Sequence, residues 1–418
     1  MRLAFVVSKF PKVTETFIQR EILHFSEASN EIRLFHLTAF RNQEIVHAFA
    51  RPVVGWTRYY PYWFSKAVIS SLFAALINRP MELGAIIGTI CRECWRRPLL
   101  LIKSLSILPK SLAIAQELKG WGADHIHAEF AGHPATCAWI VGRMTGLPYS
   151  VSCHAHDIFI SQALLLPKLK EAAFVRSISE FNKSYLCQRL KGIDASSIYV
   201  IHCGLQIKEI TPSVPPDDSE FRVLYVGSLT AKKGVDVLIR ALANLKNIEA
   251  WSCDIIGDGP NRQDMEALVV ESGIEQRVKF RGSQPFEAIA AAHGRAHVLV
   301  VPSVIAQNGD MEGIPTVAME GLALQTPVIA SRLSGVPELI RASDTGQLVD
   351  PGDVCGLARA IEWVYQNPAA AAQQASRGRK LMETQFNLSL EADKQLALFK
   401  EFSKHIQSTG SEATQVSV

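Results

Sequence analysis

The stretch GDMEGIPTVAMEGLALQTPVIAS, residues 309–331, sets two glutamates, Glu312 and Glu320, on either side of a turn and a short apolar run. Pro315 suits the first turn of a helix, where the missing N–H of proline costs nothing. The helix that follows presents unpaired backbone N–H groups and the positive end of its dipole, which together form an anion site. Carboxylates beside an anion site suit sugar hydroxyls on either side of a phosphate group. A surface helix with a glutamate cap and a solvated glutamate has the same spacing, so spacing alone leaves both interpretations open.

Two glycine-containing loops in the same half of the chain also follow strand-like apolar runs. The segment VLYVGSLTAKKG, residues 223–234, turns at Gly227 and brings Lys232 and Lys233 before the next glycine. The segment IIGDGP, residues 255–260, is another strand followed by a glycine turn. Glycine allows close backbone approach, and lysine supplies a point charge for a diphosphate. Ligands of open α/β sheets bind at the strand ends. These two loops and the loop that carries Glu312 therefore predict one anion-binding edge of a sheet.

Short β-rich runs alternate with helix-like segments along the chain, which predicts parallel sheets with crossover helices. The first series begins with the run RLAFVV, followed by an amphipathic helix with Thr14 as its cap. It continues through the β-rich runs DHIHAEF, YSVSCHA, AFVRSIS and SSIYVIHCG. A second series begins at FRVLYVG, after a proline- and charge-rich stretch at 206–221. It continues through CDIIGDG, RVKFRG, HVLVVPS, TPVIAS and GQLVD. The sequence therefore predicts two α/β halves of similar design, joined by a linker.

Composition narrows the class of protein. The chain has 418 residues, 48% hydrophobic and 20% charged, which suits two domains, and its net charge of +3 does not suggest a nucleic-acid partner. The pair Cys91 and Cys94 has no second pair to complete a zinc site, so we expect the eight cysteines to be mostly reduced, buried thiols in a cytoplasmic protein. The N-terminal apolar run breaks at Ser8 and Lys9, which favours a core strand over a signal peptide. No stretch reaches the roughly 18 unbroken apolar residues of a membrane span.

Residues 56–119 depart from the alternation. They combine apolar helical segments with aromatic residues, nine basic residues and three acidic ones. This combination suits a surface that lies in an anionic membrane interface. A helical insertion packed on the first domain, with ordinary core aromatics, is the other interpretation. The basic residues are Arg58, Lys66, Arg79, Arg92, Arg96, Arg97, Lys103, Lys110 and Lys119.

The second half resembles the nucleotide-sugar domain of glycosyltransferase family 4, retaining enzymes with the fold called GT-B. The resemblance rests on VGSLTAKKG, IIGDGP, VKFRG, VPS and above all the E-x7-E element from Glu312 to Glu320. In the first half, FPKVTETFIQREI, HIHAEFAGHPAT and HAHDIF resemble a branch associated with bacterial exopolysaccharide assembly, the colanic-acid and amylovoran type. The resemblance covers nearly the whole chain. It implies an α/β fold with two Rossmann-like domains facing each other across a cleft.

On this basis the chain divides into five segments. They are an acceptor-binding domain at 1–205 with a helical insertion at 56–119, a linker at 206–221, a nucleotide-sugar-binding domain at 222–385, a C-terminal helix at 386–405 that returns to the first domain, and a disordered tail at 406–418.

The resemblance also assigns roles to individual residues. Glu312 would contact hydroxyls of the donor sugar, Glu320 would bind the nucleotide ribose, and Lys233 would hold the diphosphate together with backbone amides. Residues 280–283 would lie near the base. The implied catalytic residues are His154, Glu312 and Lys233. The implied donor-binding residues are Gly227, Ser228, Lys232, Gly257, Arg281, Gly313, Ile314, Pro315, Thr316 and Glu320.

One position departs from the family pattern. The family usually has arginine directly after the first glycine of GSLTAKKG, where this chain has Ser228. Part of the diphosphate clamp is then missing, and Lys232 or Arg281 are the candidates to replace it. The departure also supports a rival hypothesis, a non-catalytic nucleotide-sugar-binding protein on the same fold.

The histidines allow a second chemistry. His154, His156 and Asp157 follow a strand, and H-x-H with a carboxylate is also a metal pattern of hydrolases. A metal-dependent amidohydrolase is therefore an alternative, although such enzymes need further ligands at successive strand ends of one barrel. The resemblance instead places His154 opposite the donor sugar. His127 and His133 are secondary candidates, for which a satisfied core histidine is the simpler interpretation.

The sequence thus predicts a retaining hexosyltransferase that uses a nucleotide-diphospho-sugar as donor and needs neither metal nor cofactor. The expected acceptor is a glycan or a polyprenyl-diphosphate-linked oligosaccharide in exopolysaccharide or cell-surface glycan biosynthesis. We expect peripheral contact with an anionic membrane at the inner face of the plasma membrane, and no nucleic-acid partner.

Overall fold

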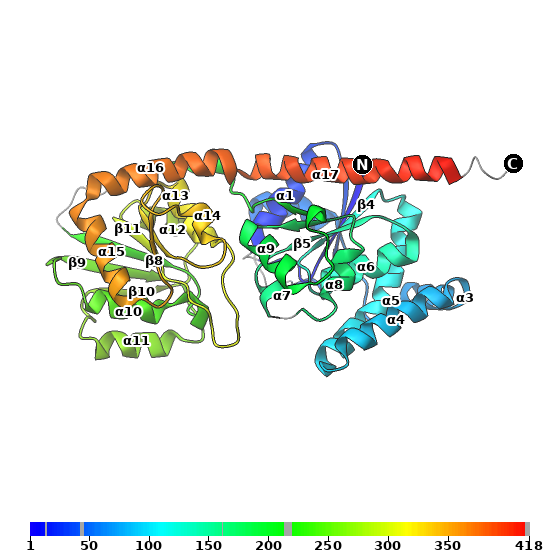
Figure 1. Cartoon of the computed structure of the whole chain (residues 1–418), viewed down its shortest axis with the longest axis horizontal. Helices are drawn as coiled ribbons and strands as arrows, with labels where there is room; N and C mark the ends of the chain where they lie inside the picture. The colour runs from blue at the N-terminus through cyan, green and yellow to red at the C-terminus, as the bar shows by residue number, and fades with distance from the viewer. Residues whose placement is uncertain (13–14, 42–45, 161, 213–219, 414–418) are drawn as a thin grey trace. The chain divides into compact units, whose positions relative to one another are not determined.

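The computed structural model describes residues 1–12, 15–41, 46–160, 162–212 and 220–413 (Figure 1). The chain divides into two compact units, each described here by itself. The break at Cys203 and Gly204 lies next to the predicted boundary at 205. The first unit comprises Met1–Ile178, Asn182–Cys203 and Glu391–Val418, and the second comprises Ser179–Phe181 and Gly204–Leu390.

The first unit is built on a seven-stranded sheet in the order β3-β2-β1-β4-β5-β6-β7, with every neighbouring pair parallel. Sequence patterns located β1 and the strands from β4 to β7 but missed β2, which carries charged residues, and β3, which is two residues long. The strands are β1 (Arg2–Val7), β2 (Glu31–His36), β3 (Thr57–Arg58), β4 (His125–Glu129), β5 (Tyr149–Cys153), β6 (Phe174–Ser177) and β7 (Ile198–Val200).

Helices cover both faces of this sheet, which explains why β4 and β5 are buried along their whole length (Figure 1). The helices are α1 (Thr16–Glu27), η2 (Ala48–Ala50), α2 (Arg51–Gly55), α3 (Lys66–Asn78), α4 (Pro80–Cys94), α5 (Pro98–Trp121), α6 (His133–Thr145), α7 (His156–Phe159), α8 (Leu165–Lys170), α9 (Glu180–Arg189), η3 (Ala195–Ser197) and α17 (Leu388–Ala413).

The second unit is a six-stranded parallel sheet in the order β10-β9-β8-β11-β12-β13. All six strands coincide with predicted runs: β8 (Phe221–Val226), β9 (Trp251–Ile256), β10 (Val278–Gly282), β11 (Val298–Val301), β12 (Val328–Ser331) and β13 (Gln347–Val349). The helices are η4 (Ile207–Glu209), η5 (Ala231–Lys233), α10 (Val235–Ala243), α11 (Arg262–Glu271), α12 (Phe286–His293), α13 (Thr316–Ala323), α14 (Val336–Leu339), α15 (Val354–Gln366) and α16 (Pro368–Gln385).

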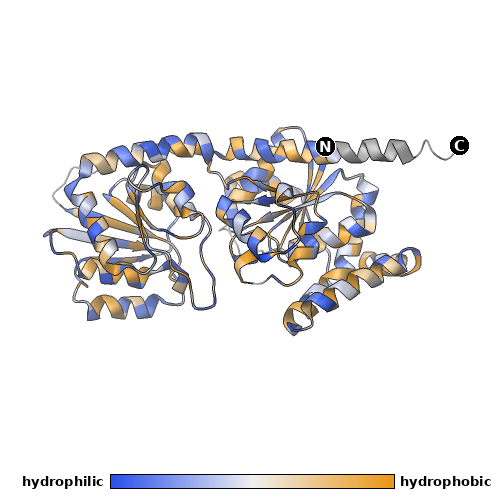
Figure 2. Ribbon diagram, viewed as in Figure 1, coloured by the Kyte–Doolittle hydropathy of each residue, from blue (hydrophilic) through white to orange (hydrophobic). Residues whose placement is uncertain are grey.

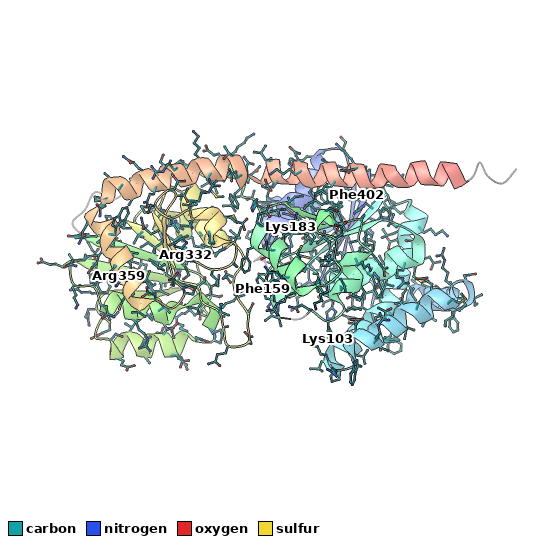
Figure 3. All side chains as sticks on the ribbon, viewed as in Figure 1. Lys103, Phe159, Lys183, Arg332, Arg359 and Phe402 are labelled. Atoms are coloured by element: carbon teal, nitrogen blue, oxygen red, sulfur yellow. The ribbon has the colours of Figure 1, made fainter. Side chains whose placement is uncertain are left out.

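Apolar residues on α1 and α17 bury one face of the first sheet. Phe25 of α1 stacks on Phe5 of β1 with ring centroids 5.7 Å apart, and Phe399 of α17 meets Phe25 edge-on at 5.5 Å. Phe402, labelled in Figure 3, continues this contact against Phe174. The predicted cap Thr14 lies outside the described residues, and the helix begins at Thr16 without a side-chain cap bond.

The predicted insertion at 56–119 needs a correction. β3 belongs to the sheet, and the second half of α5 is buried as the crossover helix before β4, packed against α6. α3, α4 and the first half of α5 instead carry large apolar side chains that are exposed, and orange segments mark the apolar residues of these helices in Figure 2. Among the described residues, α5 alone is long and apolar enough to cross a membrane, and its crossover role accounts for the apolar residues of its buried second half.

The predicted tail also needs a correction. α17 runs from Leu388 to Ala413, so the chain remains helical beyond 405, where disorder was expected to begin. The residues after 405 are polar and carry no apolar periodicity, so their pattern does not predict a helix. Residues 414–418 lie outside the described residues, as does 213–219 of the predicted linker.

Candidate functional site

A glycine fixes the loop after β8 in the second unit. Gly234 has φ +64°, and a Cβ at this position would lie 1.9 Å from the carbonyl oxygen of Pro302. The backbone N–H of Val304 donates to the carbonyl of Lys232 at 2.9 Å. Only glycine permits this approach, which holds the lysine loop against the loop that follows β11.

The two lysines of this loop meet the first glutamate of the E-x7-E element. Lys233 Nζ donates to Glu312 Oε2 at 2.8 Å, and Lys232 Nζ lies 3.5 Å from Glu312 Oε1. Lys232 Nζ is also 3.1 Å from Asp310 Oδ2, a partner that the sequence interpretation missed. Two ammonium groups face two carboxylates, so the formal charge of the cluster is balanced. An incoming diphosphate therefore needs further donors besides the lysines.

The start of α13 supplies such donors. α13 begins at Thr316, follows Pro315, and has no side-chain cap bond, which leaves the N–H groups of Thr316 and Val317 available, whereas that of Ala318 donates to the carbonyl of Pro315 at 3.1 Å. Behind this loop, Ser334 Oγ lies 2.5 Å from the carbonyl of Glu312 and 2.7 Å from that of Gly313. A Cβ on Gly335 would come within 2.8 Å of Ile314. Contacts with Ser334 and Gly335, in the connection between β12 and α14, therefore hold the loop that carries Glu312 in place.

Glu320 lies one helical turn inside α13 and is largely buried. Burial raises the pKa of its carboxyl group to about 7, although the nearby Lys233 acts to lower it. The structure thus brings the second glutamate within electrostatic range of the lysine that binds the first one. A carboxyl group tuned to neutral pH in this position suits a ligand that offers hydroxyl groups.

This raised pKa predicts how stability depends on pH. The unfolded chain releases the proton near the ordinary value of 4.5, and the folded chain near 7, so the free energy of unfolding falls as pH rises through that window. Glu320→Gln removes this penalty. We expect the variant to gain up to about 3 kcal/mol over wild type at about pH 8.5, and little at about pH 5, in thermal unfolding of the full chain. A difference independent of pH would contradict the burial argument.

The glycine turns after β8 and β9 meet at the same edge. A Cβ on Gly257, whose φ is +136°, would lie 1.9 Å from the carbonyl oxygen of Gly227. The N–H of Gly257 donates to the carbonyl of Gly282 at 2.8 Å, so the predicted base region, 280–283, reaches this edge. Ser228 lies in the same loop, and the Tyr225 hydroxyl donates to its carbonyl at 3.1 Å.

Arg281 does not join this cluster. Its Nε donates to Asp254 Oδ1 at 2.8 Å, and the pair lines a separate cavity beside Lys279. Neighbouring Phe280 packs on the core, so strand alternation turns Arg281 to the opposite face. Of the two proposed substitutes for the missing arginine, the structure brings only Lys232 to the lysine–glutamate cluster.

His154 belongs to the first unit, at the end of β5. Its Nε2 lies 3.3 Å from Glu129 Oε2, its backbone N–H donates to Asp157 Oδ1 at 3.0 Å, and its carbonyl accepts from Asn182 Nδ2 at 2.9 Å. Burial lowers the pKa of His154, but contacts with the Cys203 thiol and Glu129 outweigh it and raise the pKa above its usual range. Glu129 was not predicted, although it stands in the HAE run after His127.

The metal-hydrolase interpretation finds no support here. The first unit is an open sheet and not a barrel. Within the part of the chain that the structure describes, no group of three His, Cys, Asp or Glu side chains is placed to hold a metal ion. His127 is a satisfied core histidine, bonded to Ser150 and Ser152 at 2.7 and 2.8 Å. Five of the eight cysteines are buried, and all are free.

Comparison with known proteins gives the family of this chain. Residues 206–381 match the family model described as glycosyl transferases group 1. The chain belongs to this family. It is 27% identical to the amylovoran biosynthesis glycosyltransferase AmsK of Erwinia amylovora, covering 95% of this chain and 98% of that protein. It is also 27% identical to the putative colanic acid biosynthesis glycosyltransferase WcaL of Escherichia coli strain K12, covering 93% of this chain and 96% of that one. The predicted resemblance to this branch is confirmed.

Solved structures of related shape confirm the fold. Anabaena Alr3699/HepE in complex with UDP has a TM-score of 0.67 at 17% identity, and the match covers 97% of this chain and 99% of that one. The predicted GT-B class, with two Rossmann-like α/β units, is confirmed by this likeness and by the two parallel sheets. In this group 1 glycosyl transferase, Lys232, Lys233 and Glu312 thus meet at one edge of the second sheet.

Proposed function

We propose that this glycosyltransferase moves a hexose from a nucleotide-diphospho-sugar to a glycan or lipid-linked oligosaccharide, with retention of configuration, in exopolysaccharide biosynthesis. The observation that carries the proposal is the cluster of Lys232, Lys233, Glu312 and Glu320 beside the uncapped start of α13. Cations and free N–H groups suit a diphosphate, and flanking carboxylates suit the hydroxyls of a sugar and a ribose. The UDP complex of a structural neighbour supports a donor of this class.

Each residue then has one task in the transfer. Lys233 and the backbone N–H groups of Gly313, Ile314 and Thr316 stabilise the charge that develops on the leaving diphosphate. Glu312 accepts hydrogen bonds from the sugar, and its ion pair with Lys233 keeps both groups in place before the donor arrives. The leaving phosphate oxygen lies on the same face of the donor sugar as the acceptor hydroxyl, and it takes the proton of that hydroxyl. Neither glutamate therefore acts as the acid or base of a hydrolase. These groups supply the charge stabilisation without a metal ion.

A nucleotide-sugar screen tests this proposal. We expect one nucleotide sugar to raise the melting temperature of the full chain and to be converted to a nucleoside diphosphate with chelator present. Stabilisation without turnover, with acceptor lipid extracts supplied, would favour a binding protein instead. Activity that is lost in chelator and restored by zinc would favour the hydrolase alternative.

We also propose that the chain binds the inner face of the plasma membrane peripherally through the helical arm, defined as 63–103. Large apolar side chains there are strongly exposed, including Phe64 at 93%, Met81 at 86% and Trp95 at 66%. Arginines and lysines are exposed beside them, among them Lys103, labelled in Figure 3. Lys110 must be removed from the predicted basic set, because its ammonium is buried, donates to the carbonyl of Leu37 and lies over tyrosine rings.

This surface predicts binding to anionic vesicles that salt partly reverses. Each basic residue near an anionic surface is worth about 1 kcal/mol. Replacing Arg92, Arg96 and Arg97 with glutamate should therefore release the chain from vesicles while nucleotide binding persists. The measurement is co-sedimentation with phosphatidylglycerol vesicles across a salt series. A matched control replaces three exposed arginines of the second unit, Arg277, Arg359 and Arg377, with glutamate. Equal loss in both variants, or no binding by wild type at low salt, would contradict the proposal.

A further inference from the structure

One face of the second sheet is polar and open to solvent on the side of its edge strand β10. Phe280 of β10 packs on the core, whereas Lys279 and Arg281 belong to the other face and are exposed. Across the parallel ladder, Lys279 lies beside Asp254 of β9, and Asp254 lies beside Leu224 of β8. Parallel sheets are normally covered on both faces, so this exposed polar patch departs from the usual pattern.

A cavity of about 180 Å³ lies on this open face. Its lining comes from β8, β9 and β10, from the end of α12 and from the residues just after that helix. Leu224, Ala292 and Ala296 are its buried apolar part. Of the described residues that line it, none belongs to the loops at 227–234, 257–260 or 309–316. The cavity is therefore separate from the lysine and glutamate cluster.

The lining carries a net positive charge. Its cations are Arg222, Lys279, Arg281 and Arg295, and its carboxylates are Glu220 and Asp254. Each carboxylate already has an arginine partner, because Arg222 Nε lies 3.2 Å from Glu220 Oε2 and Arg281 Nε lies 2.8 Å from Asp254 Oδ1. Lys279 and Arg295 are exposed and form no ion pair among the described residues. Four cations against two carboxylates leave a formal charge of +2.

The free hydrogen-bond donors of the cavity suit phosphate oxygens. Arg281 uses only its Nε for Asp254, and its two terminal nitrogens form no hydrogen bond among the described residues. A guanidinium group presents its N–H donors as a fork that fits a phosphate group. A phosphomonoester carries a charge of about −1.5 to −2 at pH 7, which matches the lining, whereas one carboxylate carries only half of it. Charge and donors together favour a phosphomonoester.

The volume of the cavity limits the size of this ligand. A water molecule takes about 30 Å³ of liquid, so the space holds the equivalent of about six water molecules. Pockets for larger ligands measure about 300–1,000 Å³, and a nucleotide sugar would need a pocket of that class. A phosphate group with a short carbon skeleton fits, and its carbon atoms would lie against Leu224, Ala292 and Ala296.

We propose that this cavity is a second anion site, which binds a small organic phosphomonoester such as the phosphate of a sugar or polyol. Its phosphate oxygens would contact Lys279, Arg281 and Arg295, and its carbon skeleton the buried apolar part of the lining. The inference goes beyond the proposed transfer reaction and does not depend on it. It also gives Arg281 a binding role away from the donor diphosphate, where the sequence had placed it.

The test is titration calorimetry of the full chain with glycerol 3-phosphate, inorganic phosphate and glycerol as probes. We expect glycerol 3-phosphate to bind most tightly, inorganic phosphate about threefold to tenfold more weakly, and glycerol not at all. Lys279→Met and Arg295→Met should each weaken glycerol 3-phosphate binding by about tenfold, since each removes one charged hydrogen-bond donor. Lys380→Met and Arg240→Met, at exposed cations of the same unit outside the cavity, are the matched controls and should bind as wild type does.

Lys233→Met separates the cavity from the donor edge. We expect this variant to bind glycerol 3-phosphate as wild type does, and equal weakening by Lys233→Met and Lys279→Met would overturn the proposal by placing the anion at the donor edge. Binding that only the cavity variants weaken supports the site even if no nucleotide sugar is turned over.

Three further results would overturn the assignment. Equal weakening by the cavity variants and their matched controls would indicate nonspecific attraction. Inorganic phosphate that binds as tightly as glycerol 3-phosphate would remove the role of the apolar lining. Wild type that binds neither phosphate, and self-associates in a way that Lys279→Met and Arg295→Met abolish, would assign the open face to a second copy of the chain. Melting temperatures of all variants confirm that each one is folded.

Discussion

Lys233→Met should lower kcat/KM for donor turnover by about 10²- to 10³-fold. The ammonium group of Lys233 lies 2.8 Å from Glu312, the carboxylate that we assign to the donor sugar. It also acts electrostatically on Glu320. When the glycosidic bond breaks, negative charge develops on the diphosphate, and a fixed cation stabilises that charge more than it stabilises the bound donor. Methionine keeps the unbranched stem and removes only the charge, so the loss reports electrostatics and not packing.

Lys232→Met is the matched control for this substitution. Lys232 lies next in sequence but divides its charge between Asp310 at 3.1 Å and Glu312 at 3.5 Å. We expect a smaller loss, about tenfold, carried mostly by KM. The measurement is steady-state release of nucleoside diphosphate. If both variants lose activity equally, the two lysines act as one diffuse charge, and the specific assignment to Lys233 is wrong.

Arg176→Met should destabilise the first unit by about 3–5 kcal/mol. Arg176 of β6 is fully buried and binds Glu21 of α1 through two hydrogen bonds of 2.8 Å each. It also donates to Gln395 of α17 at 2.7 Å and to the carbonyl of Ile201 at 3.1 Å. Removing the guanidinium leaves a buried carboxylate without its partner, which costs more than the pair itself contributes.

The double variant Arg176→Met with Glu21→Leu separates the cost of the unpaired carboxylate from the contribution of the ion pair itself. Replacing both partners of a buried pair with apolar side chains is often close to neutral, so we expect the double variant to recover much of the lost stability. Chemical denaturation of the full chain, followed by circular dichroism, gives both values. A double variant no more stable than Arg176→Met would show that the cost lies in packing around α1 and α17 instead.

The sequence predicts the strands of the second unit well, and it predicts β2 and the helices between 56 and 119 poorly. The strands β11 and β12 of the second unit coincide with apolar runs, because a parallel strand covered on both faces is apolar along its length, whereas the edge strand β10 alternates between buried and less buried residues. β2 escaped prediction, because Glu31 and Arg33 interrupt its run. The bounds of the predicted insertion at 56–119 were partly wrong, because an apolar helix in the core and one on the surface have similar composition. The structure distinguishes them at α5, where the buried half carries Lys110.

The sequence predicts individual residues of the candidate site but not the contacts between them. The E-x7-E spacing and the lysine loop located Glu312, Glu320 and Lys233 from sequence. The contact between Lys233 and Glu312 joins residues 79 positions apart, and only the fold brings them together. Asp310 and Glu129 went unnoticed because a single carboxylate carries no signal until its partner is placed beside it.

Release of a nucleoside diphosphate from the nucleotide sugar that stabilises the chain tests the donor-site assignment most directly. With purified full-length protein, lipid-linked acceptor and chelator present, wild type should release nucleoside diphosphate and transfer the sugar. Glu312→Ala should lose transfer while free nucleoside diphosphate still binds nearly as before, and Glu320→Gln should weaken donor and nucleoside diphosphate alike. Turnover that survives in Lys233→Met combined with Glu312→Ala, at the wild-type rate, would contradict the assignment of the reaction to this edge of the second sheet.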